Sequence, residues 1–115
     1  MWISEVTIST TQSSVKAGDS GVLTCIAKAN DVGTDIKWFK GDSETPLNSD
    51  DTAYTISTTL ATSFEADGKT KQSTSSLSIL NFDADDVASY SCKMDYNDPI
   101  LDDQSAGQAL TILGK

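Results

Sequence analysis

Two cysteines and the residues spaced around them constrain the fold of this chain more than any other feature. Trp38 follows Cys25 by 13 positions, and Tyr90 stands two positions before Cys92 at the end of the run DVASYSC. This order of residues is typical of a sandwich of two β-sheets, in which the tryptophan is buried and the tyrosine fixes a corner. The spacing therefore predicts the architecture, but it does not indicate a ligand.

The length and charge of the chain narrow the classes of function. Its 115 residues fit one domain, and they include 17 acidic residues against 8 lysines, with no arginine and no histidine. The net charge of −9 opposes binding to nucleic acid or to anionic lipid, and the absence of histidine removes the usual general base near neutral pH. We therefore expect one domain over residues 1–115, which is not an enzyme and binds neither nucleic acid nor a membrane.

Short runs of alternating polar and apolar residues, broken by Gly, Asp, Asn or Pro, predict an all-β fold. The eight or nine expected strands cover 2–9, 13–17, 21–28, 35–40, 45–48, 54–65, 70–80, 88–95 and 108–113, with a single helical turn near 83–86. The Ser/Thr-rich stretch 57–78 is expected to face solvent. Within each expected strand, every second residue is expected to point into the core. These core residues are Leu23, Cys25, Ala27, Ile36, Trp38, Leu77, Ile79, Tyr90, Cys92, Met94, Leu110 and Ile112, with Phe82 beneath the corner.

Together, Cys25, Trp38 and the motif Asp86-x-Ala88-x-Tyr90-x-Cys92 resemble the immunoglobulin superfamily over essentially the whole chain. The resemblance implies a β-sandwich of two antiparallel sheets with Greek-key topology, a Cys25–Cys92 disulfide beneath Trp38, and structural corner roles for Asp86 and Tyr90. A bridge that closes a loop of this length contributes about 4 kcal/mol in the chain-entropy model. It also needs an oxidising compartment, so the resemblance implies an extracellular domain. The alternative is a pair of reduced buried thiols, as in cytosolic members of the family.

The subtype rests on the 67 positions that separate the cysteines. The interval between Trp38 and Leu77 has room for the extra strands of variable-type domains. The last nine residues are similar to the joining-segment strand of antigen-receptor light chains, but no Phe-Gly-x-Gly bulge precedes them. No arginine is present to pair with Asp86, which must use Lys69, Lys71 or backbone donors. We expect a diverged variable-type domain of a cell-surface or secreted immune-type receptor. The alternative is an intermediate-type domain that acts as a structural spacer in an intracellular muscle-type or an extracellular tandem array.

Family members bind protein partners through loops at one end of the sandwich or through one sheet face. The loop 95–103 is long and acidic, and it carries large apolar groups that a solvated loop seldom needs. Tyrosine provides a large contact area at low entropic cost. We expect partner contact here, unless Ile100 and Leu101 fold back onto the sandwich. The candidate contact residues at this end are Tyr96, Asn97, Asp98, Ile100, Leu101 and Asp31.

Phe39 is the candidate anchor on the sheet face, because it alternates away from Trp38. An exposed aromatic there suggests docking of a protein ligand or of a second copy, unless Leu47 covers it. Lys37 and Lys93 are expected to point outward beside it and to form a small basic spot.

The acidic residues at the loop end also raise the question of a cation site. Four carboxylates of the loop 95–103 lie near Asn30, Asp31 and Asp35 in the expected fold, but the spaced pattern of a calcium loop is absent. We therefore expect a solvated acidic rim, with no metal and no cofactor.

Overall fold

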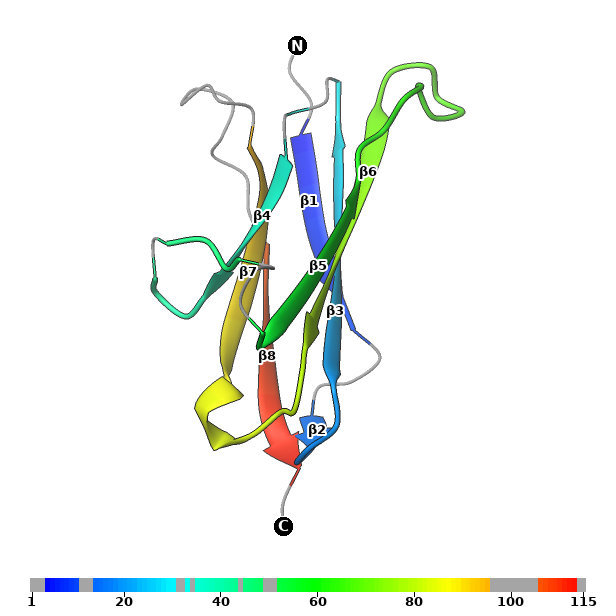
Figure 1. Ribbon diagram of the computed structural model, residues 1–115. Coiled ribbons are helices and arrows are strands. Elements are labelled where there is room, and N and C mark those ends of the chain that lie inside the picture. The colour runs from blue at the N-terminus through cyan, green and yellow to red at the C-terminus, as the bar shows by residue number, and fades with distance from the viewer. Residues whose placement is uncertain are drawn as a thin grey trace.

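Two β-sheets face each other in the computed structural model of this chain (Figure 1). The structure describes residues 4–10, 14–30, 33, 35–43, 45–48, 52–95 and 106–113. A short 3₁₀ turn, η1 (Ala84–Asp86), precedes the seventh strand of this part of the chain. Its strands are β1 (Ser4–Ser9), β2 (Ser14–Lys16), β3 (Gly21–Ala29), β4 (Asp35–Lys40), β5 (Tyr54–Thr59), β6 (Lys71–Ile79), β7 (Ala88–Asp95) and β8 (Ala106–Leu113).

Each sheet contains four strands, in the orders β1-β3-β6-β5 and β2-β8-β7-β4. All paired strands are antiparallel except β2 and β8, which run parallel. In strand order, the chain changes sheet between β1 and β2, β2 and β3, β3 and β4, β4 and β5, and β6 and β7. The prediction of an all-β sandwich is confirmed.

The core fills the space between the sheets, and strict alternation along the strands builds it. In β3 every second residue is buried, and β6 and β7 follow the same pattern because successive side chains of a strand point to opposite faces. Phe82 lies beneath the corner with no exposed surface, as expected, and Ile112 is half-buried at the edge. The other predicted core residues are all at most 2% exposed: Leu23, Cys25, Ala27, Ile36, Trp38, Leu77, Ile79, Tyr90, Cys92, Met94 and Leu110.

A disulfide joins the two sheets between Cys25 of β3 and Cys92 of β7, with an S–S distance of 2.04 Å. Trp38 lies directly opposite Cys92 in the β4–β7 register and has no exposed surface. Its Nε1–H donates to Ser75 Oγ at 2.9 Å, and Ser75 is the register partner of Cys25. The tryptophan therefore connects the sheets a second time, by a hydrogen bond beside the disulfide.

The expectation that the stretch 57–78 faces solvent is wrong for two serines. Ser73 and Ser75 have no exposed surface, because they share the parity of Leu77 and Ile79 on β6. Ser73 Oγ accepts from Ala61 N at 2.9 Å, and the hydroxyls of Ser75 and Thr58 lie 2.9 Å apart. Buried hydroxyls are tolerated when they find partners of this kind.

Two expected strands differ from the structure. Residues 45–48 form no strand; Leu47 N donates to Trp38 O at 2.7 Å, but Pro46 has no N–H to donate to a strand ladder. The strand expected over 54–65 ends at Thr59, and a wide turn over 60–70 follows. Among the described residues between Lys40 and Tyr54 there is no extra strand of the variable type.

A tyrosine corner closes the connection between β6 and β7. The Tyr90 hydroxyl donates to Asp86 O at 2.5 Å, and Asp86 Oδ2 accepts from Asp83 N at 3.0 Å. The backbone donor expected for Asp86 is thus confirmed, whereas Lys69 and Lys71 are not its partners. Lys40 Nζ instead donates to Asp85 O across the same corner. Burial, with smaller contributions from Tyr54 and Asp86, raises the pKa of Tyr90 well above its ordinary value of 10.0.

We expect Tyr90→Phe to lower the free energy of unfolding by about 1 kcal/mol, because it removes one buried hydrogen bond. The native state holds the Tyr90 hydroxyl protonated, while the unfolded chain ionises it near pH 10. This contribution is therefore present below pH 10 and is lost above it. Urea titrations of both proteins at pH 8 and pH 10.5 check this. A stability difference that does not narrow at the higher pH would contradict it.

The turn between β5 and β6 is held by one carboxylate. Asp67 Oδ1 accepts from Lys69 N at 2.8 Å and from Thr70 N at 3.0 Å, and Asp67 Oδ2 accepts from Thr70 Oγ1 at 2.8 Å. Gly68 follows with φ of 69°, as expected for the Asp-Gly pair of a turn. These hydrogen bonds, first that from Lys69 N, lower the pKa of Asp67 from 3.8 to about 2.

We expect the carboxyl carbon of Asp67 to titrate with a midpoint of about 2 in an NMR pH series. Because the folded pKa is lowered, the stabilising contribution is complete above pH 3.8 and is lost as the pH falls towards 2. Thr70→Val removes the hydroxyl donor and should move the midpoint upward. A midpoint near 3.8 in the unaltered protein would contradict the turn geometry.

Candidate functional site

The outer surface of the strands β4, β7 and β8 is the candidate binding site. Because Ile36 and Trp38 point into the core, the alternate residues of β4 point outward, and β7 and β8 follow the same rule. We call this surface the β4–β7–β8 face. It comprises Asp35, Lys37, Phe39, Ser89, Ser91, Lys93, Asp95, Gly107 and Ala109.

Phe39 is the large apolar residue of this face, and small residues lie beside it. It pairs with Ser91, which in turn pairs with Gly107, and the adjoining row pairs Ser89 with Ala109. A Cβ at Gly107 would lie 3.6 Å from Tyr90 O and meet no closer atom, so the surface above it is open. Phe39 is half-buried, and Leu47, the residue considered as its cover, packs against the core.

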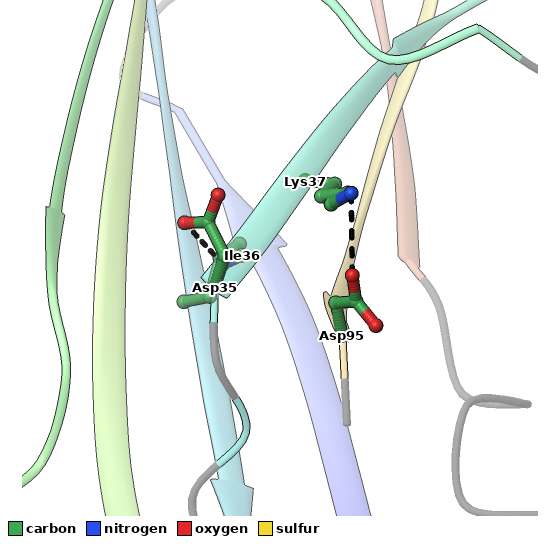
Figure 2. A network of polar contacts seen from close by, with 4 residues as sticks. All are labelled: Asp35, Ile36, Lys37 and Asp95. Carbon is green, nitrogen blue, oxygen red and sulfur yellow. Dashed lines mark hydrogen bonds and ion pairs between the residues drawn. The ribbon is translucent and has the colours of Figure 1, made fainter. Parts of the chain in front are cut away.

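Charged residues occupy the end of the face next to the loops (Figure 2). Lys37 Nζ lies 3.2 Å from Asp95 Oδ2, with the two side chains 38% and 22% exposed. Asp35 Oδ1 accepts from Ile36 N at 2.8 Å. At this exposure the ion pair contributes under about 1 kcal/mol. The expected basic spot of Lys37 and Lys93 is thus half neutralised by a carboxylate.

An open hollow of about 480 Å³ lies between β4 and β5, at the edges of the two sheets. Apolar and polar residues both line it, among them Leu47, Ile56, Trp38, Asp35, Lys37 and Thr58. Its mixed lining gives it no distinct chemical preference.

Gly33 has a structural role that the sequence reasoning missed. A Cβ at this position would lie 2.3 Å from Asp95 O, so any side chain would displace backbone atoms. This contact places Gly33 against the end of β7, at Asp95.

All six predicted loop contacts lie outside the described residues. These are Asp31, Tyr96, Asn97, Asp98, Ile100 and Leu101, and their roles stay predictions. The described part of the chain brings together only Phe39 and the charged residues of the face.

Phe64 is a further aromatic residue that the sequence reasoning did not single out. It lies in the turn between β5 and β6, is 53% exposed, and has Lys71 Nζ 4.9 Å from its ring centroid. Its position inside a run of Ser and Thr gave no periodic signal for an exposed aromatic.

The described residues contain no group of three or more His, Cys, Asp or Glu side chains arranged to hold a metal ion. In the same part of the chain, no helix has the length and hydropathy needed to cross a bilayer.

Comparison with known proteins gives one family. A model described as immunoglobulin domain matches residues 5–95, which is more than half of the chain. A search of curated proteins finds no match. The matched region contains both cysteines, Trp38 and the tyrosine corner, so the family assignment and the geometry rest on the same residues. The chain belongs to the immunoglobulin domain family.

Proposed function

We propose that this immunoglobulin domain is a non-catalytic recognition module of a cell-surface or secreted receptor, and that residues 1–115 act as one module. It binds a protein partner through the β4–β7–β8 face, with the adjoining loops around residue 31 and over 95–103 adding contacts. The family as a whole supports a binding role. The Cys25–Cys92 disulfide supports an oxidising, extracellular environment.

The observation that carries this proposal is the setting of Phe39. A large aromatic ring stands on an outer sheet surface next to the small residues Ser91, Gly107, Ser89 and Ala109. Binding energy in protein interfaces concentrates in a few aromatic anchors that small, water-excluding neighbours surround. Lys37 and Lys93 border the ring on one side and supply the polar rim of such a patch.

We expect Phe39→Asp to weaken partner binding by at least about 30-fold, which corresponds to a hot-spot loss of about 2 kcal/mol. In the assay, a tetramer of the domain is tested for binding to a panel of recombinant ectodomains from the same proteome. The panel includes the domain itself. Binding is measured by surface plasmon resonance.

The matched control is Val22→Asp, because Val22 is 40% exposed on the outer surface of the other sheet. It changes the charge by the same amount and should leave binding unchanged. Equal losses for the two variants, or no loss for Phe39→Asp on any ectodomain that binds, would refute the site. A panel without any binder would refute the recognition role.

The second candidate function is that of a spacer in a tandem array. It is favoured by the described part of the interval between β4 and β5, where residues 41–43, 45–48 and 52–53 form no extra strand. A thiol assay on protein purified from its source separates the two functions. Two reactive cysteines would indicate an intracellular spacer, and none would support the extracellular module.

A further inference from the structure

The turn between β5 and β6 contains the one Asp-Gly pair of this sequence, Asp67-Gly68. The turn stands at the upper end of the sandwich in Figure 1, and both residues of the pair are exposed. An aspartate followed by glycine can react without an enzyme, because the glycine has no side chain to hinder attack of its amide nitrogen on the neighbouring carboxyl group. A Cβ placed on Gly68 would meet no atom within 4 Å, so the fold adds no steric hindrance of its own.

The reaction is a loss of water followed by its return. The Gly68 nitrogen forms a bond to the side-chain carboxyl carbon of Asp67, the bond from that carbon to its hydroxyl oxygen breaks, and the hydroxyl group leaves with the amide proton as water. Hydrolysis of the resulting succinimide adds water back. When it breaks the bond between the backbone carbonyl carbon of Asp67 and the Gly68 nitrogen, the chain continues through the side chain as isoaspartate. The reaction needs no co-reactant other than water.

Hydrogen bonds engage both reacting groups in the folded protein. The Asp67 carboxylate accepts from Lys69 N, Thr70 N and Thr70 Oγ1 at 2.8, 3.0 and 2.8 Å. The N–H of Gly68 donates to Glu65 O at 2.9 Å. Attack requires that the carboxyl group turns towards the Gly68 nitrogen and that the amide leaves Glu65 O. The turn must therefore open before the succinimide can form.

The same contacts also reduce the amount of the reactive form of the carboxyl group. Water leaves from the protonated acid, and the hydrogen bonds, first that from Lys69 N, lower the pKa of Asp67 from 3.8 to about 2. Near neutral pH the protonated fraction is therefore about 60-fold smaller in the closed turn than in the unfolded chain. Because the pair is exposed and unhindered, its hydrogen bonds and not its burial set the reaction rate.

We propose that Asp67 is a latent modification site, which is converted to isoaspartate through a succinimide only when the turn between β5 and β6 opens locally. The proposal is independent of the binding function. Local opening of a turn costs less free energy than global unfolding, so the site can react while the sandwich stays folded. Isoaspartate adds a methylene group to the backbone and moves the carboxylate away from Lys69 N and Thr70 N. The product should also lose the hydrogen bond from Asn30 Nδ2 to Lys69 O, which joins the turn to the end of β3.

The test is ageing of the full chain at 37 °C and neutral pH. Proteolytic digestion and mass spectrometry separate the isoaspartyl peptide from the aspartyl peptide of equal mass, and a synthetic peptide of residues 62–73 is the unprotected reference. The folded protein is expected to form isoaspartate at Asp67 at least about 60-fold more slowly than the peptide, which is the factor from protonation alone.

Variants of Thr70 change the hydrogen bonds of Asp67 directly. Thr70→Val removes the hydroxyl donor and should raise the rate in the folded protein at least about 3-fold. Thr70→Ser keeps the hydroxyl and should react at nearly the rate of the unaltered chain. Circular dichroism checks that each variant folds, and Thr70→Ala replaces Thr70→Val if the valine variant does not.

Two further variants separate local opening from other causes. Thr62→Val alters an exposed threonine of the same turn that is not among the described donors to Asp67, and it should leave the rate unchanged. Tyr90→Phe destabilises the whole domain at a distant corner, and it should also leave the rate unchanged, because global unfolding is not the route. The proposal is overturned if the peptide reacts no faster than the folded protein, or if the variant without the Thr70 hydroxyl reacts no faster than Thr62→Val. It is also overturned if Tyr90→Phe accelerates the reaction as much as loss of that hydroxyl does.

Discussion

Replacing both Cys25 and Cys92 with alanine is expected to lower the free energy of unfolding by about 4 kcal/mol. The bridge spans 67 positions, and without it the unfolded chain regains the freedom that this loop closure removes. Domains are typically stable by only about 5–15 kcal/mol, so the variant should be marginal at 37 °C. Urea denaturation at 25 °C measures the loss.

Reduction of the unaltered protein provides the control. The reduced protein should unfold at nearly the same urea concentration as the double variant, and the reductant should not affect the double variant. A loss below about 1 kcal/mol would show that the reduced pair packs well enough to replace the bridge. That result would favour the spacer function, because an intracellular domain must be stable with reduced thiols.

Trp38→Ala is expected to cost a comparable amount, about 3–5 kcal/mol, because it leaves a large cavity next to the disulfide. Trp38 has no exposed surface and fills the space between β4 and β6. Phe64→Ala is the control, since Phe64 is an aromatic residue that is 53% exposed. It should cost under about 0.5 kcal/mol in the same urea titration.

The indole hydrogen bond can be separated from the packing of the ring. Trp38→Phe and Ser75→Ala each remove one partner of the 2.9 Å contact, and a double-mutant cycle isolates their coupling. We expect a coupling of about 1 kcal/mol. A coupling near zero would mean that the hydrogen bond between Ser75 and Thr58 satisfies the serine without the indole.

The architecture could be predicted from the sequence because its signals are local. Alternation along a strand assigns Leu23, Ile79 and Met94 to the core whatever the strand pairs with. The same rule predicts that Ser73 and Ser75 are buried, because both lie an even number of positions before Leu77 on the same strand. The Ser/Thr-rich composition of the stretch indicates solvent exposure instead, and the prediction for these two residues is wrong.

The arrangement of the candidate site depends on the register between β4 and β7, which alternation within each strand does not predict. Lys37 and Asp95 meet because β4 and β7 pair with one particular offset, and a different offset would place other residues together. Of the partners expected for Asp86, the backbone donor is confirmed and the two lysines are not: Asp83 N, three residues away in the same turn, makes the contact.

The contacts of the first residues of β4 have a consequence for how this protein can associate. Trp38 O accepts from Leu47 N, so residues 36 and 38 direct their backbone groups away from β7, along the open side of the sheet. On that side, the carboxylate of Asp35 accepts a hydrogen bond from the N–H of Ile36. An incoming strand would have to displace both contacts and approach a negative charge. This edge of the sheet is thus guarded against lateral extension, the route by which β-proteins polymerise into fibres.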